Sequence, residues 1–148
     1  MAHEFKLKRR VEFHETDMAG IMHFSNFFRW MEAAEVGFFR SLGLSLHPGD
    51  GQDSIGWPKV HVECDYHAPL RFEDQVEIHL LVRKMGRRSI TYQFIFRRLD
   101  ESPIQEVARG AVVSACVTHN RATGRIEPVP IPLEIAELID AAPYAAAD

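Results

Sequence analysis

The segment that most constrains the fold is a long apolar stretch over residues 25–42, SNFFRWMEAAEVGFFRSL. Its apolar residues recur at the spacing of an α-helix, and Gly43 directly after it is a natural helix stop. Ser25 or Asn26 would serve as the N-cap, because short polar side chains accept hydrogen bonds from the first free backbone amides. Charged residues form only a narrow stripe along this helix, so other structure has to cover most of its circumference.

The residues before and after this helix predict the structure that covers it. One strand is predicted before the helix and four after it, at residues 6–13, 58–68, 75–85, 89–98 and 106–119. Residues 44–57 are rich in Gly, Pro and Asp and lack periodicity, which predicts a long loop. Strands joined by short turns favour an antiparallel sheet, and a single apolar helix requires that this sheet curve around it. Gly37 lowers helix propensity, which a close approach of the helix to the sheet would explain.

The length of the chain, 148 residues, suits one domain and is too short for two ordinary ones. The pattern of strands and helix occupies residues 5–132 and shows no internal repeat or linker. A short helix is predicted over residues 133–140, followed by an Ala-rich tail that we expect to fray. The sequence therefore predicts a single α+β domain over residues 1–148.

Charge and cysteine usage restrict the function and the compartment. The formal net charge of −4 argues against nonspecific nucleic-acid binding. The opening MAHEFKLKRR lacks the apolar core of a secretory signal, and no stretch reaches the length of a transmembrane helix. Cys64 and Cys116 stand singly in predicted strands without metal or redox spacing, which indicates buried thiols in a reducing compartment. We expect a cytoplasmic protein.

A distinctive segment precedes the helix. In VEFHETDMAGIMHF, residues 11–24, Asp17 and Gly20 lie between a predicted strand and the helix N-terminus. A carboxylate at this place can act as a nucleophile or as a general base. The helix N-terminus adds free backbone amides and the positive end of the helix dipole. As an ordinary loop residue, Asp17 would only stabilise the turn before Gly20.

The motif DMAGIMHF at residues 17–24 resembles the signature of hotdog-fold acyl-CoA thioesterases, in the branch of 4-hydroxybenzoyl-CoA thioesterase. This resemblance, which extends over residues 5–132, implies a curved, mostly antiparallel five-stranded sheet wrapped around one long central helix. It implies that Asp17 is the nucleophile or the general base. It further implies that the backbone amide of Phe24, alone or with that of His23, stabilises the thioester oxygen. The His23 imidazole then either lines the pocket or takes part in catalysis.

The same resemblance points to a set of residues for substrate binding: Gly20, Trp57, His61, Val62, Lys84, Arg87 and Arg88. The three basic residues surround a turn that meets the phosphates of CoA in the family, and guanidinium groups suit phosphate geometry. Without a ligand they would form only a solvated hairpin tip. His61 and Val62 match the strand that lines the acyl and pantetheine channel, and Trp57 either covers the acyl group or packs at the sheet edge.

Other titratable residues offer alternatives. A further hotdog branch carries its catalytic acid on the central helix, so Glu32 and Glu35 are rival acids. Glu32 lies on the polar stripe, where a salt bridge is expected, and Glu35 at its edge is the second candidate after Asp17. His14, three residues before Asp17, is either its partner or an ordinary strand-end histidine. The alternating acids and histidines of residues 61–67 predict a polar or intersubunit face, because a single strand rarely converges enough ligands on a metal.

The sequence thus predicts a hotdog domain that hydrolyses the thioester of an aromatic or short acyl-CoA to the free acid and CoA. It needs no metal and no cofactor, since CoA is part of the substrate. By resemblance the protein is a homo-oligomer, a dimer or tetramer with active sites between subunits. A noncatalytic acyl-CoA-binding or sensing protein is one alternative, and a hotdog dehydratase or hydratase is another. The acyl preference stays open.

Overall fold

The computed structural model describes residues 1–47, 53–120 and 122–143. Its elements, in chain order, are β1 (Glu4–Arg10), the 3-10 helix η1 (Phe13–Glu15), α1 (Ser25–Ser41), β2 (Asp53–Gly56), β3 (Lys59–Tyr66), β4 (Gln75–Met85), β5 (Ser89–Arg98), β6 (Gln105–Ala115), β7 (Val117–Asn120), β8 (Arg125–Pro128) and α2 (Leu133–Ala136). Among these described elements, no helix has the length and apolar character needed to cross a bilayer.

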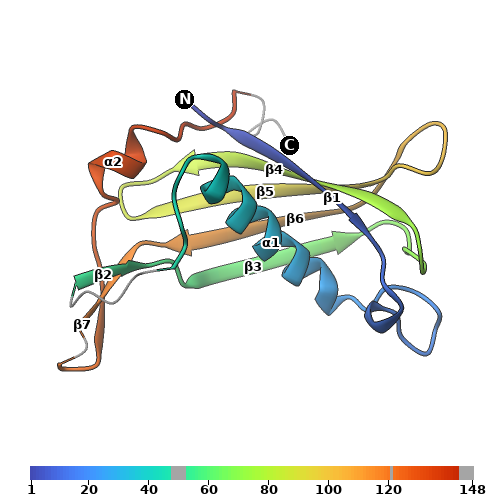
Figure 1. The fold of residues 1–148 in the computed structure, drawn as a ribbon, viewed down its shortest axis with the longest axis horizontal. Coiled ribbons are helices and arrows are strands. Elements are labelled where there is room, and N and C mark those ends of the chain that lie inside the picture. The colour runs from blue at the N-terminus through green and yellow to red at the C-terminus, as the bar shows by residue number, and fades with distance from the viewer. Residues whose placement is uncertain (48–52, 121, 144–148) are drawn as a thin grey trace.

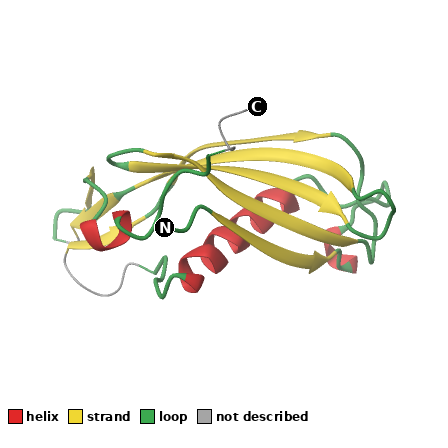
Figure 2. Cartoon of the chain, turned by 90° about the horizontal axis from the view of Figure 1, so that it is seen from above, coloured by secondary structure: helices red, strands yellow, loops and turns green. Residues whose placement is uncertain are grey.

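The main sheet has five strands in the order β1-β4-β5-β6-β3, and every neighbouring pair is antiparallel. α1 lies across one face of this curved sheet, as Figures 1 and 2 show. The helix buries its aromatic face in the core, where Phe27, Trp30, Phe38 and Phe39 are each 3% exposed or less. The predicted α+β architecture, one long helix packed on a five-stranded antiparallel sheet, is confirmed.

Two glycines let α1 approach the sheet closely. A Cβ added at Gly37 would lie 2.6 Å from the ring of Phe5 in β1. A Cβ added at Gly110 in β6 would overlap the Met31 side chain and lie 3.0 Å from the backbone oxygen of Glu63. The predicted reason for a glycine at position 37, close contact between helix and sheet, is confirmed.

The first strand ends three residues earlier than predicted. β1 stops at Arg10, and Phe13 turns outward into η1, where it is 74% exposed. The turn starts because the backbone N–H of Glu12 donates to the Glu15 carboxylate at 2.8 Å. Outside the sheet, Phe13 packs edge-to-face on Phe72, with ring centroids 5.6 Å apart. The alternation that suggested a strand through Phe13 was therefore wrong beyond Arg10.

A second sheet, β2-β7-β8, was not predicted. β2 lies in the segment expected to be a long loop, of which residues 48–52 are outside the described residues. The strand predicted over residues 106–119 breaks at Cys116 into β6 and β7. Each strand of this sheet has four residues, too short an alternation for a reliable periodic signal. The predicted C-terminal helix is also shorter, since α2 ends at Ala136.

The start of α1 differs from the predicted capping. The N-cap is Phe24, with helical dihedral angles of φ −55° and ψ −29°, while Ser25 and Asn26 both lie inside the helix. Their polar atoms still serve the helix start: the Ser25 amide donates to His23 Nδ1 at 3.3 Å, and the Asn26 side chain donates to the Glu15 carbonyl at 2.8 Å. The predicted stop at Gly43 is confirmed by its φ of +76°.

We expect Gly110→Ala to lower the free energy of unfolding by about 1–3 kcal/mol, the usual cost of overpacking a core. The new methyl group would meet both Met31 and a backbone oxygen. Gly56→Ala is the matched control, because its Cβ would lie 3.5 Å from Val117 Cγ2, an ordinary contact. Urea unfolding of the two variants measures the difference. Equal stabilities would show that close packing is not what requires glycine at position 110.

Candidate active site

Asp17 is held in a tight turn at one end of the molecule. Thr16 and Met22 form an isolated antiparallel bridge, and the Gly20 amide donates to the Asp17 carbonyl at 2.9 Å. Gly20 has φ +78°, a backbone conformation that glycine adopts without strain. Of the carboxylate oxygens, Oδ1 accepts the Ala19 amide at 2.9 Å, and Oδ2 takes no hydrogen bond from the described part of the chain. One oxygen of Asp17 is thus fixed and the other is left for a ligand.

The backbone amides at the start of α1 differ in their partners. The His23 amide donates to the Glu15 carbonyl at 2.8 Å, so it is occupied. The Phe24 amide has no acceptor within the described residues, and its carbonyl accepts the Tyr66 hydroxyl at 3.1 Å. Burial is the main reason that the pKa of Tyr66 rises to about 12, so this phenol keeps its proton at neutral pH. Of the two amide donors considered from the sequence, only that of Phe24 is open.

Asp17 and Phe24 line one cavity of about 410 Å³. The other lining residues come from the same loop, from the start of α1, and from the end of β3 with the segment that follows it: Ile21, Met22, Phe27, Tyr66, His67, Ala68, Pro69 and Leu70. Sequence reasoning did not assign Tyr66 and His67 to this site. Their only signal was a position at the end of a predicted strand, which does not reveal what that strand end faces.

A buried carboxylate fixes the Asp17 loop to α1. Glu15 is 9% exposed, and its Oε2 accepts the indole N–H of Trp30 at 2.8 Å, while Oε1 accepts the Glu12 amide at the same distance. The backbone carbonyl of Glu15 accepts both the His23 amide and the Asn26 side chain. Glu15 was also missed from the sequence, because nothing distinguishes it there from a solvated loop glutamate.

His23 and His14, the two histidines near Asp17 in the sequence, differ in their contacts. His23 Nδ1 lies 2.8 Å from the Ser25 hydroxyl and accepts the Ser25 amide, so the proton of the neutral ring is on Nε2. Its ring stacks on Phe24 with centroids 4.4 Å apart. His14 is exposed on η1, and no hydrogen bond or ion pair joins it to Asp17 in the described part of the molecule. His23 therefore supports the helix start, and the pairing of His14 with Asp17 is not seen.

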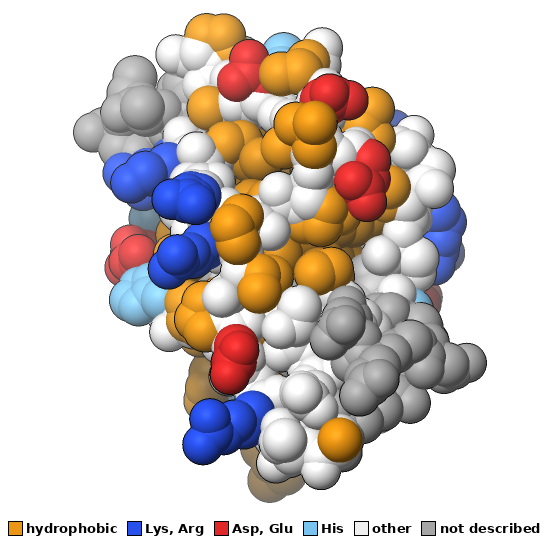
Figure 3. Space-filling view, turned by 90° about the vertical axis from the view of Figure 1, so that its left-hand side faces the viewer, with side chains coloured by type: hydrophobic (Ala, Val, Ile, Leu, Met, Phe, Trp, Pro, Cys, Tyr) orange, Lys and Arg blue, Asp and Glu red, His pale blue; other side chains and the backbone are white. Residues whose placement is uncertain are grey.

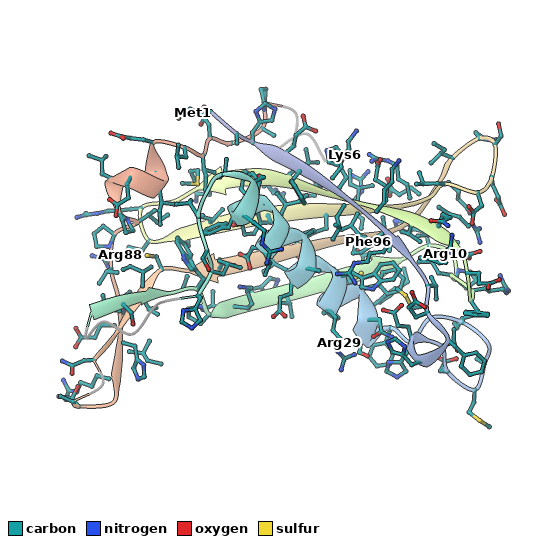
Figure 4. The ribbon with its side chains drawn as sticks, in the orientation of Figure 1. Met1, Lys6, Arg10, Arg29, Arg88 and Phe96 are labelled. Carbon is teal, nitrogen blue, oxygen red and sulfur yellow. The ribbon has the colours of Figure 1, made fainter. Side chains whose placement is uncertain are left out.

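The basic turn with Arg87 and Arg88 lies at the opposite end of the folded molecule from Asp17. In Figure 4 Arg88 is at the left and Arg29, near the start of α1, is at the right. The turn that carries Arg87 and Arg88 is anchored, since their carbonyls accept the Ile131 and Cys116 amides at 2.9 and 2.8 Å. Figure 3 shows Lys and Arg side chains beside a hydrophobic area at this end. One chain does not bring the basic turn to Asp17.

The remaining predicted binding residues are also separated. Trp57 is 8% exposed and packs on Phe39, with ring centroids 5.4 Å apart, so it is a packing residue. His61 Nε2 lies 3.4 Å from the carboxylate of Glu63, and alternation along β3 puts both on the face opposite Val62. Within the described residues, no group of three or more His, Cys, Asp or Glu is placed to hold a metal ion.

Glu35 and Glu32, the alternative catalytic acids on α1, differ in their surroundings. Glu35, expected at the edge of a polar stripe, is 1% exposed and forms an ion pair of 2.6 Å with Lys59. Its other oxygen accepts the Ser114 hydroxyl at 2.7 Å. Glu32 is exposed. Both glutamates line a second cavity of about 220 Å³ that also contacts Val62. Glu35 is thus engaged, whereas Asp17 has a free oxygen.

The fold and this loop define the class of protein: a hotdog domain with a carboxylate just before its central helix. Residues 11–139 match the thioesterase-like superfamily, and the chain belongs to this family. The predicted enzyme class, a thioester hydrolase, is confirmed by this membership.

Individual relatives agree with membership of the thioesterase-like superfamily. A protein of Aquifex aeolicus provisionally named an esterase is 35% identical over 137 residues, which cover 91% of this chain and 97% of that protein. A 1,4-dihydroxy-2-naphthoyl-CoA hydrolase of Prochlorococcus marinus is 33% identical over 102 residues, or 64% of this chain and 66% of the hydrolase. The structure of 4-hydroxybenzoyl-CoA thioesterase from Pseudomonas sp. strain CBS-3 superposes with a TM-score of 0.80 at 23% identity, covering 93% of this chain and 99% of that one. At this identity the superposition shows a shared fold.

We expect Glu15→Gln to lower the free energy of unfolding by about 1–3 kcal/mol, the cost of leaving a buried donor unsatisfied. Glutamine has one oxygen and one NH₂ group at the places of the two carboxylate oxygens. The NH₂ group would face either the Trp30 indole N–H or the Glu12 amide N–H, both of which are donors. Urea unfolding measures the loss, and Glu127→Gln on exposed β8 is the control. If both variants unfold at the same urea concentration, Glu15 does not anchor the loop.

Proposed function

We propose that the protein hydrolyses acyl-CoA thioesters to the free acid and CoA, with Asp17 as the catalytic carboxylate. The observation that carries the proposal is the pairing of two free groups in one cavity. Asp17 Oδ2 and the Phe24 amide both lack a protein partner in the described residues, and both residues line the same 410 Å³ cavity. The acyl-CoA hydrolases among the relatives support this class of substrate.

Two routes use the same atoms. As a general base, Oδ2 takes a proton from water, whose oxygen attacks the carbonyl carbon; the C–S bond then breaks and the CoA sulfur receives the proton. As a nucleophile, Oδ2 attacks the carbon itself and expels the CoA thiolate, and water hydrolyses the resulting anhydride. In both routes the Phe24 amide donates to the oxygen that becomes negative, aided by the α1 dipole.

The alternative functions receive less support from the same geometry. A dehydratase would need a histidine working beside the acid, yet in the described residues His14 forms no hydrogen bond or ion pair with Asp17, and His23 Nδ1 is engaged by Ser25. A sensor would need neither the free carboxylate oxygen nor the free amide. The aromatic rings of Phe24, Phe27 and Tyr66 on the cavity wall favour an aromatic acyl group over an aliphatic one.

We infer that the working unit contains at least two copies of the chain, paired along β3. This strand ends the sheet order, and its apolar residues Val60, Val62 and Tyr66 are 64%, 48% and 45% exposed. An open apolar edge is a ready template for pairing with another strand. Antiparallel pairing centred between Val62 and Glu63 would set Tyr66 of one copy opposite Lys59 of the other. The Asp17 end of one copy would then approach the Arg88 end of its partner.

We expect Asp17→Asn to lower kcat by about 10²–10⁴-fold, the usual contribution of a catalytic base or acid. Thiol release from a panel of acyl-CoAs measures the rate, and Asp140→Asn, at an exposed residue outside the strands whose Oδ1 also accepts a neighbouring backbone amide, is the control. Near wild-type turnover by Asp17→Asn would exclude it as the catalytic group. Tight acyl-CoA binding by the wild-type protein without any turnover would favour the sensor.

We expect Val60→Asp to separate the paired copies into monomers, because a carboxylate within an apolar strand pairing is costly to bury. Sedimentation velocity at several concentrations reports the mass. Ile104→Asp places the same charge at a residue that is 56% exposed and outside the strands, and should leave the mass unchanged. A Val60→Asp protein that stays dimeric would show that β3 is not the interface.

A further inference from the structure

Arg98 is a mostly buried cation at the end of β5, and the proposed reaction gives it no role. Its side chain is 12% exposed. It lies two residues after Phe96 along the strand, so both side chains point to the face of the sheet that carries α1. In Figure 4 Phe96 lies toward the end of the sheet that carries Arg10, away from Arg88. A buried charge is costly unless acceptors surround it, so a reason for its presence is needed.

The guanidinium group of Arg98 meets acceptors from two connections of the sheet. Nη1 lies 3.5 Å from the Pro69 carbonyl oxygen and 3.5 Å from Asp74 Oδ2, both in the connection between β3 and β4. These distances are long for hydrogen bonds, so charge attraction accounts for most of the contact. Nη2 donates to Gln105 Oε1 and lies 3.7 Å from Glu101 Oε1, at the β5–β6 connection. Arg98 therefore ties one connection to the other.

The segment of residues 69–74, within the β3–β4 connection, contributes to the wall of the Asp17 cavity. Leu70 of this segment is 1% exposed, and its carbonyl accepts the Met22 amide at 2.7 Å. Met22 pairs with Thr16 in the isolated bridge that closes the turn around Asp17. The position of the Leu70 carbonyl therefore determines where this turn lies against the cavity wall.

The same segment also holds the chain that leads into the Asp17 loop. The Val11 amide donates to the Asp74 carbonyl at 3.0 Å, and the Glu73 amide donates to the Val11 carbonyl at 2.9 Å. Asp74 Oδ2 accepts the Arg71 amide at 2.8 Å, which closes a tight turn. Glu73 has φ +72°, and strain of this kind persists only where the surrounding contacts impose it. The segment thus holds the chain both before and after Asp17.

We propose that Arg98 is a positioning residue for the Asp17 carboxylate, because it fixes the cavity wall to which the Asp17 loop is bound. The inference rests on the proposed thioesterase function. An attacking atom has to lie about 3–3.5 Å from the carbon that it attacks, so a small displacement of the loop removes the reactive geometry. Arg98 is not among the residues that line the cavity, so it acts through the wall and takes no part in bond breaking.

The first test is kinetic. We expect Arg98→Met to lower kcat for acyl-CoA hydrolysis by about 10- to 100-fold with little change in KM, because Asp17 is displaced while the binding surface remains. Rates are measured well below the thermal midpoint of the variant, so that loss of stability alone leaves kcat unchanged. Arg97→Met removes the ion pair with Glu77 on the opposite face of the sheet and, as the matched control, should keep the wild-type kcat. If Arg98→Met does not fold, Arg98→Gln replaces it. A wild-type kcat in the folded variant would overturn the inference.

The second test asks whether Arg98 acts through Asp74. Asp74→Asn keeps an oxygen for the Arg71 amide but removes the negative charge that pairs with Arg98. If the two residues act as one unit, the doubly substituted protein should lose about as much kcat as the slower of the two single variants. Losses that multiply would show that Arg98 acts independently of Asp74, which would contradict the proposed route.

Hydrogen exchange of single amides, followed by NMR, tests the positioning without any substrate. In Arg98→Met the Met22 amide should lose protection, because its acceptor on Leu70 is no longer held in place. The Val129 amide, which donates to the Cys116 carbonyl at 3.0 Å near the basic turn, should keep its protection. Unchanged protection at Met22 would contradict the positioning role. If Met22 loses protection but the wild-type protein hydrolyses no acyl-CoA, the thioesterase function is wrong and the hold of Arg98 on the loop stands.

Discussion

The geometry of the loop that carries Asp17 depends on one buried carboxylate. Glu15 accepts the Trp30 indole from inside α1 and the Glu12 amide from the chain before it, while its own carbonyl holds the His23 amide. These bonds set the distance between the Asp17 turn and the first residues of α1. They also occupy the His23 amide, which leaves the Phe24 amide as the open donor at the helix start. A charged group that is costly to bury is here retained because it fixes two elements against each other.

The packing of α1 then determines where the site can form. Gly37 and Gly110 allow α1 to lie in close contact with the curved sheet, so side chains fill the space between helix and sheet. Cavities remain along the β3 side of the helix, one at Asp17 and one at Glu35. The basic turn at Arg87 and Arg88 lies at the far end of the same sheet. In our proposal a second copy, paired along the open edge of β3, brings the basic turn of one chain to the Asp17 end of the other.

Local sequence signals predicted the parts of this structure that depend on local chemistry. The helical periodicity of residues 25–42 and the stop at Gly43 gave α1, and the alternation of residues 75–85 and 89–98 gave two strands with their observed bounds. The Asp17 motif was recognisable because turn and helix start adjoin in the chain. The Glu35–Lys59 pair and the Tyr66–Phe24 bond could not be predicted, since their partners are 24 and 42 residues apart. Glu15 and Trp30 meet only after the loop folds back on α1.

The most direct test of the account concerns the Phe24 backbone, because a side-chain substitution leaves its amide in place. Replacing Phe24 with phenyllactic acid converts the amide N–H into an ester oxygen and keeps the ring. Steady-state hydrolysis of an acyl-CoA that the wild-type protein turns over then reports the loss of one donor. The account predicts a fall in kcat of about 10²–10³-fold with little change in KM. An unchanged kcat in a folded protein would contradict the claim that Asp17 and the Phe24 amide form the reaction centre.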